Sequence, residues 1–207
     1  MDFRKLLSEF PLVAILRGLA PDNAMAIGEA LVEAGFRIIE VPLNSPQPFV
    51  SIERLAKAFP DAMIGAGTVL DPKDVDRVRD AGGRLIVMPH SDPEVIRRAR
   101  ALGLSCTPGV ATPSEGFAAL RAGVDAIKLF PAEAMPPAVV RAWRAVFPKD
   151  ALFLPVGGIK PGTMKAFVEA GANGFGLGSA LFTPSLSARE VSQNAKTFAE
   201  AWRSLAS

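Results

Sequence analysis

The fold is decided by a pattern whose clearest copy reads Arg121-Ala122-Gly123-Val124-Asp125-Ala126-Ile127-Lys128-Leu129-Phe130-Pro131. Gly123 suits the left-handed residue that ends many helices, and the apolar run after it suits a short strand buried on both faces. The same helix end, followed by an apolar run, recurs at Glu33-Ala34-Gly35, Asp80-Ala81-Gly82, Leu102-Gly103 and Glu169-Ala170-Gly171. Asp or Thr caps a helix and proline fits its first position, so helix starts are predicted at Asp71-Pro72, Asp92-Pro93 and Thr112-Pro113.

Eight apolar runs are therefore predicted to be parallel strands, separated by amphipathic helices such as 93–102 and 113–121. The predicted strands cover residues 12–17, 37–41, 63–68, 85–88, 104–107, 126–130, 152–156 and 174–178. Eight even strand–helix units predict an α/β fold of the (β/α)8 TIM barrel type, with residues 1–207 as one domain. A short helix at 1–10 would lie at the bottom of the barrel, and a helix at 188–205 would close the ring. An open doubly wound sheet is the alternative, and the even spacing of the units favours the barrel.

The composition argues against several classes of protein. Of the 207 residues, 49% are hydrophobic and 21% are charged, which supplies a large core and argues against disorder. A net charge of +2 is too small to indicate binding to nucleic acid or to an acidic membrane. The uncharged run 170–188 is interrupted by glycine and proline, so it is not a membrane helix. The single cysteine, Cys106, fits a reducing compartment, and the single histidine, His90, argues against a multi-histidine metal site.

Lys128 is the one charged residue inside the apolar run 126–130. Burial disfavours the ammonium form, so such a lysine either pairs with an acid or loses its proton. An unprotonated lysine is a nucleophile toward carbonyl carbons and can form a Schiff base. The alternative is a lysine that extends its side chain out of the strand end into water.

In a (β/α)8 barrel the chemistry lies at the carboxyl ends of the strands, and three charged residues fall there. Arg17, Glu40 and Lys128 come at or near the ends of strands one, two and six, so we expect them to converge on one mouth. A carboxylate in that position has its pKa raised by burial or pairs with a cation. Arg17 can donate two hydrogen bonds to a carboxylate or a phosphate. Structural ion pairs among these residues are the alternative.

Two glycine-containing loops follow the last two predicted strands, at Gly157-Gly158 and Gly178-Ser179. Glycine lets backbone N–H groups approach an anion closely, and these two loops form the usual phosphate site of this fold. The pattern therefore predicts a phosphorylated substrate. Among the remaining candidates, His90 is expected to be incidental, Cys106 to be packed in the core, and Phe130 and Phe182 to be core residues.

Three motifs together resemble a known family. They are Glu40-Val41-Pro42-Leu43-Asn44-Ser45-Pro46, Gly65-Ala66-Gly67-Thr68-Val69 and Ile127-Lys128-Leu129-Phe130-Pro131. In this order the chain resembles the bacterial 2-keto-3-deoxy-6-phosphogluconate and 6-phosphogalactonate aldolases, from about residue 11 to about residue 182. The resemblance implies a homotrimeric barrel in the cytoplasm that acts as a class I aldolase without a metal or another cofactor. Its ligands would be a phosphorylated 2-keto-3-deoxy sugar acid and pyruvate.

The resemblance also implies a role for each matching residue. Lys128 matches the Schiff-base lysine and Glu40 the general acid and base. Arg17 and Thr68 match positions that contact the substrate. The loops Gly157-Gly158 and Gly178-Ser179 match the loops that hold the phosphate.

Two residues bear on which sugar acid is cleaved. The phosphogluconate branch of the family typically has Arg where Asn44 stands and Thr where Val156 stands, so the chain resembles the phosphogalactonate branch. The two substrates differ in the configuration of one hydroxyl, and replacing a threonine hydroxyl by a methyl removes a partner that could favour one epimer. We therefore expect cleavage of 2-dehydro-3-deoxy-6-phosphogalactonate to pyruvate and glyceraldehyde 3-phosphate, as in galactonate catabolism. Cleavage of the gluconate epimer, as in the Entner-Doudoroff pathway, is the alternative.

Two rival functions remain on the same fold. A sugar-phosphate epimerase or isomerase that depends on a metal would need several His and Asp ligands at the strand ends. A barrel without catalytic activity could bind a sugar phosphate as a sensor, with Lys128 only neutralising the phosphate charge.

Overall fold

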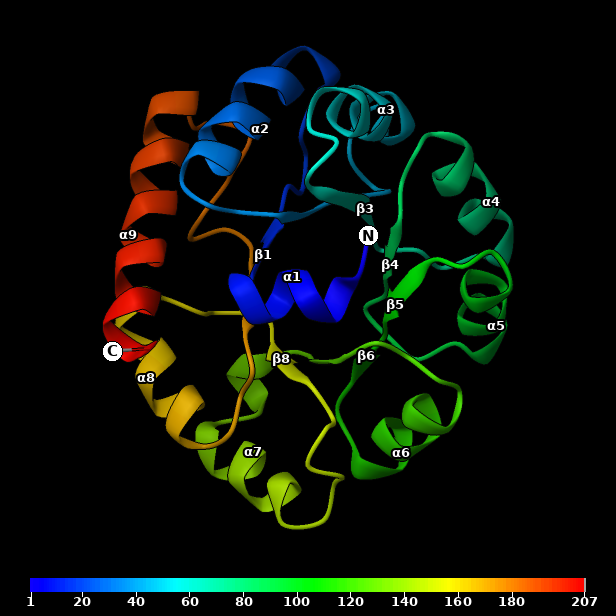
Figure 1. The fold of residues 1–207 in the computed structure, drawn as a ribbon, viewed down its shortest axis with the longest axis vertical. Coiled ribbons are helices and arrows are strands. Elements are labelled where there is room, and N and C mark those ends of the chain that lie inside the picture. Colours follow the sequence, from blue (N-terminus) through cyan, green and yellow to red (C-terminus); the bar gives the residue numbers. More distant parts are fainter. Residues whose placement is uncertain (207) are drawn as a thin grey trace.

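The structure, a computed structural model that describes residues 1–206, is a ring of short parallel strands enclosed by helices (Figure 1). Ser207, the last residue of the predicted domain, lies outside the described residues. The strands are β1 Leu12–Ile15, β2 Ile38–Pro42, β3 Met63–Gly67, β4 Leu85–Val87, β5 Ser105–Thr107, β6 Gly109–Val110, β7 Ile127–Leu129, β8 Phe153–Pro155 and β9 Phe175–Leu177. Each of the eight predicted runs overlaps one of these strands, most of the strands are shorter than predicted, and β6 lies outside the predicted runs.

Helices alternate with the strands along the chain, as the sequence pattern predicts. They are α1 Phe3–Glu9, α2 Ala24–Glu33, α3 Pro48–Ala58, α4 Pro72–Asp80, α5 Pro93–Ala101, α6 Pro113–Arg121, α7 Pro137–Arg144, α8 Pro161–Glu169 and α9 Ala188–Ala206, with short 3-10 helices η1 Pro21–Asn23 and η2 Ala132–Ala134. The predicted caps are confirmed, because the side chains of Asp71, Asp92 and Thr112 accept hydrogen bonds from the first turns of α4, α5 and α6. The predicted cap glycines are also confirmed, with φ angles between 69° and 108° at Gly35, Gly82, Gly103, Gly123 and Gly171.

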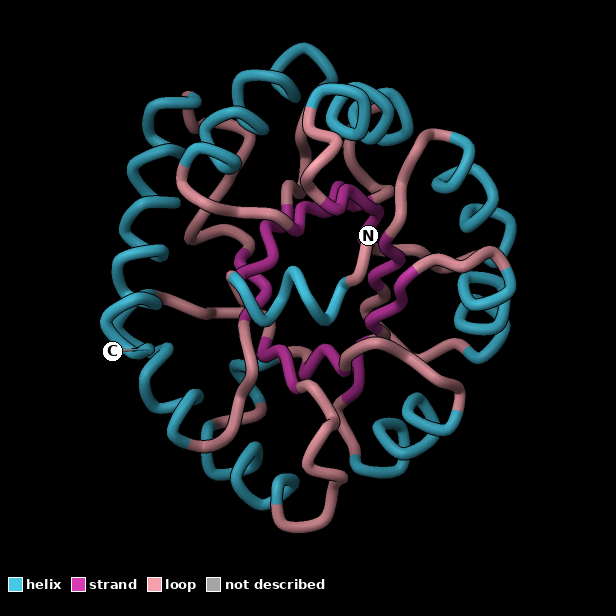
Figure 2. The backbone as a smooth tube through the Cα atoms, in the orientation of Figure 1, coloured by secondary structure: helices cyan, strands magenta, loops and turns pink. Residues whose placement is uncertain are grey.

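The hydrogen-bonded ladder is divided, so the barrel prediction is confirmed in its coarser form. One sheet has six parallel strands in the order β5-β4-β3-β2-β1-β9, and a second has three in the order β6-β7-β8. An isolated parallel bridge between Val156 and Gly176 links the two sheets on one side. On the other side β5 ends at Thr107, as predicted, and Pro108, which has no N–H to donate to a ladder, separates it from β6, which was not predicted. The result is a curled, TIM-barrel-like ring (Figure 2).

Two strand ends differ from the prediction for a local reason. β1 stops at Ile15 and β3 stops at Gly67, so Arg17 and Thr68 lie in the loops just beyond. Thr68 has a φ angle of 54°, which is incompatible with an extended strand. Both residues therefore stand on the rim of the ring and not within its wall.

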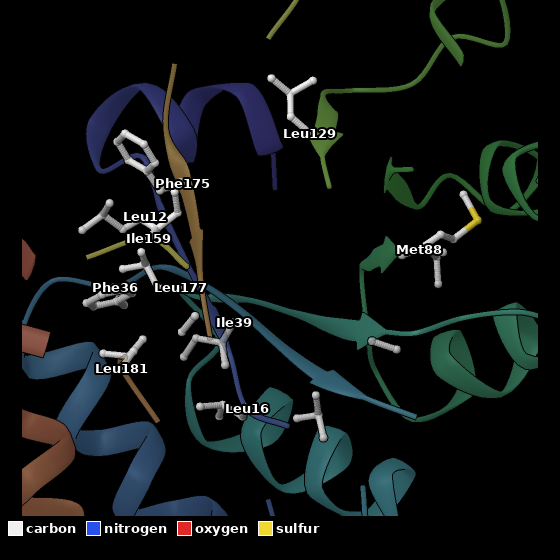
Figure 3. Packing of buried hydrophobic residues seen from close by; sticks show 14 of the residues in the cluster. Leu12, Leu16, Phe36, Ile39, Met88, Leu129, Ile159, Phe175, Leu177 and Leu181 are labelled. Carbon is white, nitrogen blue, oxygen red and sulfur yellow. The ribbon is translucent and has the colours of Figure 1, made fainter. Parts of the chain in front are cut away.

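Alternate residues of each strand pack into two separate hydrophobic clusters. The outer cluster fills the space between strands and helices and includes Leu12, Ile39, Leu129, Phe175 and Leu177 (Figure 3). The inner cluster fills the bottom of the ring and includes Val13, Ile38, Met63, Leu85 and Leu154. Burial of both sets by the hydrophobic effect fixes which side chains of each strand face inward.

Helix α1 closes the bottom of the ring, as predicted for residues 1–10. Phe3 and Leu7 belong to the inner cluster and are 1% and 3% exposed. In Figure 1 this helix crosses the centre of the ring. The bottom of the ring is therefore packed, and the mouth cavity described below lies at the carboxyl ends of the strands. No described helix is long and apolar enough to cross a membrane.

Candidate active site

Glu40 and Lys128 are the charged side chains that the ring buries. Their neighbours Ile39 and Ile127 belong to the outer cluster, so the alternation of each strand turns Glu40 and Lys128 inward. Glu40 is 1% exposed and Lys128 is 6% exposed. The prediction that these residues converge is confirmed by a shared chamber of about 20 Å³, which both of them line.

Thr107 is the third polar residue of that chamber, and it was not among the predicted site residues. It is 3% exposed, and its neighbour Cys106 belongs to the outer cluster, so the Thr107 side chain faces inward. The other residues around the chamber are mainly apolar, such as Val87 and Leu154. Strand alternation counted from Cys106 was the sequence signal that could have found it.

The acidity of Glu40 is set mainly by burial. Burial raises the pKa of the Glu40 carboxyl from 4.5 to about 7, although the positive charges of Lys128 and Arg17 act to lower it. The Oε2 atom of Glu40 has no hydrogen-bond partner among the described residues. A carboxyl group with a pKa near neutrality can both give and take a proton at physiological pH.

Burial also controls the protonation of Lys128. Loss of hydration lowers the pKa of the Lys128 ammonium, the charge of Glu40 opposes this shift, and the positive charge of Arg17 adds to it. The Nζ atom lies 4.7 Å from the centroid of the Phe130 ring. These surroundings favour the free amine more than water does, which is the form that attacks a carbonyl carbon.

Above the chamber, the mouth of the ring contains a cavity of about 530 Å³. Seven of the predicted site residues line it: Arg17, Lys128, Val156, Gly157, Gly158, Gly178 and Ser179. Lys128 lines both spaces and so connects the chamber to the mouth. The cavity brings the lysine and the two glycine-containing loops into one site, as the sequence predicted.

The two other predicted residues, Asn44 and Thr68, do not line this cavity, but both contact Arg17, which does. The Nη1 atom of Arg17 donates a hydrogen bond of 2.8 Å to Oδ1 of Asn44 and lies 3.5 Å from Oγ1 of Thr68. The positive φ angle of Thr68 is rare for a β-branched residue, and such strain clusters at functional sites. Asn44 therefore has a physical role here, because it orients the guanidinium group at the rim.

His90 and Cys106 lie outside the site. The His90 side chain is 46% exposed, and its Nε2 atom is 3.9 Å from Asp92. Cys106 is buried in the outer cluster, where burial raises the pKa of its thiol to about 12 and keeps it unreactive. Both outcomes agree with the sequence analysis. Within residues 1–206, His, Cys, Asp and Glu side chains form no group of three that could hold a metal ion.

Sequence reasoning misjudged one aromatic residue and missed two charged ones. Phe130 was predicted to be core, but it is partly exposed and lines the mouth cavity, because strand alternation turns it to the same side as Lys128. Phe182 is buried as predicted, although it too lines the cavity. Glu133 and Lys160 also line the cavity. Both stand outside the strands, where no periodic pattern indicates their direction.

Comparison with known proteins shows the family of the chain. A family model described as "Aldolase: KDPG and KHG aldolase" matches residues 3–196. The chain is 45% identical to the 2-dehydro-3-deoxy-6-phosphogalactonate aldolase of Escherichia coli strain K12 over 197 residues, which cover 95% of this chain and 96% of that one. A solved structure described as "Native KDPGal structure" has a TM-score of 0.94 at 44% identity and covers 96% of this chain and 97% of its own.

A second solved structure is that of KDPG aldolase from Legionella pneumophila, with pyruvate captured at low pH as a covalent carbinolamine intermediate. It has a TM-score of 0.83 at 27% identity and covers 99% of this chain and 98% of its own. The matched family model spans most of the chain, including every predicted site residue. The chain therefore belongs to the KDPG and KHG aldolase family.

Proposed function

We propose that this aldolase cleaves 2-dehydro-3-deoxy-6-phosphogalactonate to pyruvate and glyceraldehyde 3-phosphate through a Schiff base on Lys128. The observation that carries the proposal is the buried lysine in one chamber with a buried glutamate whose pKa is about 7. Such a reaction requires two groups: an amine that gives up its proton easily, and a carboxyl group that titrates near neutrality. The name of the Escherichia coli relative supports the choice of substrate.

The first half of the reaction forms the covalent intermediate. The free amine of Lys128 attacks the C2 carbonyl carbon, the C=O π electrons move to the oxygen, and a proton passes from the nitrogen to that oxygen to give a carbinolamine. Glu40 in its acid form protonates the hydroxyl group, water leaves, and the nitrogen lone pair forms the C=N bond of an iminium ion. The carbinolamine captured in the Legionella pneumophila relative is an intermediate of this type.

The second half breaks the C3–C4 bond. Glu40 as a carboxylate takes the proton of the C4 hydroxyl group, the C4 oxygen forms a carbonyl, and the electrons of the C3–C4 bond move into the iminium to give an enamine. Glyceraldehyde 3-phosphate leaves. Glu40 then returns a proton to C3. Water hydrolyses the resulting iminium, Glu40 takes up the proton that is released, and pyruvate leaves the free Lys128 amine.

The two ends of the substrate need separate anchors. Arg17, oriented by Asn44 and close to Thr68, is suited to the carboxylate end because a guanidinium group donates parallel hydrogen bonds. The loops Gly157-Gly158 and Gly178-Ser179 are suited to the phosphate end. Anchoring both ends holds C2 near Lys128, which lowers the entropic part of the barrier.

Asn44 and Val156 are our proposed determinants of the preferred epimer. Val156 is 7% exposed and lines both the chamber and the mouth cavity, so its methyl groups border the site of the reaction. An apolar wall there offers no hydrogen bond to a substrate hydroxyl. Because such a wall discriminates only weakly against a hydroxyl, we expect measurable cleavage of the gluconate epimer as well.

The test of the function is reductive trapping. Borohydride with pyruvate should inactivate the enzyme and label Lys128, as identified by peptide mass spectrometry. Lys128→Met should lose both the label and cleavage while it keeps its circular dichroism spectrum, and Lys149→Met, an exposed lysine, should behave as the wild type does. Label on another residue, or cleavage that a chelator abolishes, would overturn the proposal. Parallel lactate dehydrogenase-coupled assays of both epimers test the substrate.

Three broader features belong to the same proposal. We propose that the ring is a complete (β/α)8 barrel in one domain, with β5 and β6 as two parts of one strand. Support comes from the N–H groups of Asp125 and Lys128, which donate to the carbonyl oxygens of Cys106 and Pro108 at 3.0 Å on either side of the break. We also expect a homotrimer in the cytoplasm. Light scattering after gel filtration, and fractionation of the native host, would test these two expectations.

A further inference from the structure

Glu133 lies against the glycine loop that we assign to the phosphate group. A Cβ atom on Gly157 would stand 2.2 Å from Oε2 of Glu133, and a Cβ atom on Gly158 would stand 2.8 Å from its Cγ. Glu133 also lines the mouth cavity, so its carboxylate and an incoming anion would share one loop. Glu133 is exposed, and two negative charges that share one loop raise each other's free energy, although water weakens the effect.

The position of Glu133 is fixed by the backbone around it. The N–H of Ala132 donates a hydrogen bond of 2.8 Å to the carbonyl oxygen of Val156, the residue that precedes the glycine pair. The N–H of Ala134 donates to the carbonyl oxygen of Pro131 at 3.1 Å and closes the 3-10 turn η2. These bonds attach the turn to the end of β8, so Glu133 lies beside the loop because of the fold itself.

Lys160 supplies a positive charge two residues after the same glycine pair. It lines the mouth cavity and is exposed. Its backbone is held by Thr163, whose hydroxyl group accepts from the N–H of Lys160 at 3.0 Å and donates to its carbonyl oxygen at 2.9 Å. The main chain is therefore fixed, and the long side chain can reach an anion at the loop as a mobile point charge.

We propose that Glu133 and Lys160 together set the specificity for the phosphate end of the substrate. Lys160 attracts the anion to the loop, and Glu133 makes the loop unfavourable for any anion that has no second anchor in the site. The inference rests on the proposed function, because it takes the Gly157-Gly158 loop as the phosphate site. It adds two specificity residues that act in opposite directions.

The opposite charges give a physical reason for discrimination. A 2-keto acid with a distal phosphate gains a covalent bond to Lys128, which offsets the repulsion by Glu133. Inorganic phosphate gains no such bond and meets the full repulsion. The enzyme thereby resists occupation of its site by free phosphate without losing its phosphorylated substrate, which is selection against a competitor by a repulsive group.

The experiment measures the binding of inorganic phosphate directly, by titration calorimetry, to the wild type, Glu133→Gln and Lys160→Met. Glu133→Gln keeps the shape of the side chain and should lower the Kd for phosphate roughly two- to fivefold, the range expected for partly exposed charges. Lys160→Met should raise the Kd by a similar factor. Both shifts should shrink in high salt, because exposed charges are screened.

Matched controls separate local from overall electrostatics. Glu200→Gln and Lys196→Met make the same changes of charge at exposed positions on α9, and should leave phosphate binding and cleavage at wild-type levels. A Kd that is unchanged or raised in Glu133→Gln would overturn the proposal. So would a Kd that Lys160→Met leaves unchanged or lowers.

The readout is independent of the Schiff base. If borohydride trapping failed to label Lys128 while the two phosphate shifts appeared with opposite signs, the aldolase mechanism would be wrong and the specificity pair would stand. If trapping succeeded and the shifts were absent, the mechanism would stand and the assignment of Glu133 and Lys160 would be wrong. In both cases the two failures are distinguishable.

Discussion

The carboxylate of Glu40 lies over the backbone of Gly67 on the neighbouring strand, where a Cβ atom would stand 1.9 Å from Oε2 and 2.5 Å from Oε1. The residue at this position must therefore lack a side chain if Glu40 is to keep its place. Gly67→Ala should force the carboxylate away from Lys128 and lower kcat on the order of 100-fold, the loss expected when a reacting group moves by about 1 Å. Steady-state kinetics with the phosphorylated substrate measures the effect.

The control for this substitution is Gly162→Ala in helix α8, where an added Cβ meets no atom within 4 Å. It should keep wild-type kcat and gain up to about 1 kcal/mol of stability, because alanine loses less backbone entropy in a helix. Retention of full kcat by Gly67→Ala would show that the present position of the Glu40 carboxylate is not needed. Circular dichroism distinguishes a displaced carboxylate from a misfolded barrel.

Glu40 should also make the stability of the protein depend on pH. Its pKa is 4.5 ordinarily and about 7 in the folded chain, so the unfolded state releases the proton first as the pH rises. As the pH rises from 4.5 to 7, the wild type should therefore lose stability relative to Glu40→Gln, by at most about 3 kcal/mol. This pH-dependent loss should be absent below pH 4.5. Urea denaturation at a fixed protein concentration measures it.

A matched control is Glu200→Gln, which removes an exposed carboxylate from α9. Lys128 adds to this stability difference. In Glu40→Gln the pKa of the Lys128 ammonium falls further because the charge of Glu40 is gone, so the variant again gains stability relative to the wild type as the pH rises. A stability difference that stayed constant from pH 4 to pH 8 would mean that Glu40 is not desolvated in the folded protein.

The sequence was sufficient for the ring and for most of the site, because both depend on patterns of chain neighbours. Apolar runs after cap glycines located the strands, and polar residues at the strand ends located Arg17, Glu40 and the two glycine-containing loops. Strand β6 was not predicted, and Pro108, which cannot donate to a ladder, explains why it is separate from β5. Counting alternate residues from Lys128 would also have found Phe130.

The remaining features arise from contacts between distant parts of the chain. Glu133 stands in a short turn, and only the hydrogen bond between Ala132 and Val156 brings it to the glycine loop. Asn44 was predicted as a specificity residue from a family resemblance, but its hydrogen bond to Arg17 could not be read from spacing. Such contacts depend on how loops settle on the rim, and no periodicity specifies them.

Val156 gives the sharpest test of the substrate. Val156→Thr keeps the shape of the side chain and adds one hydroxyl group at the border of the reaction chamber. A hydrogen bond gained by the gluconate epimer would be worth about 1 kcal/mol, so the preference in kcat/KM for the galactonate epimer should fall about fivefold. Val156→Ala removes bulk without adding a polar group and should keep the preference. A ratio that rises in Val156→Thr would contradict the assignment of this residue.

The hydroxyl group of Thr107 should tune the acidity of Glu40, because both side chains line one small and otherwise mainly apolar chamber. Removing a polar neighbour from a buried carboxyl group disfavours its charged form further. In Thr107→Val the pKa of Glu40 should therefore rise above its present value of about 7, and the limb of the kcat/KM profile in which activity falls as the pH rises should move to higher pH, because the free enzyme needs Glu40 in its acid form. Thr107→Ser keeps the hydroxyl group and should leave the limb near its original position. If Thr107→Val lowered kcat without moving the limb, Thr107 would contribute by packing alone, and the chamber would tune Glu40 through burial and charge only.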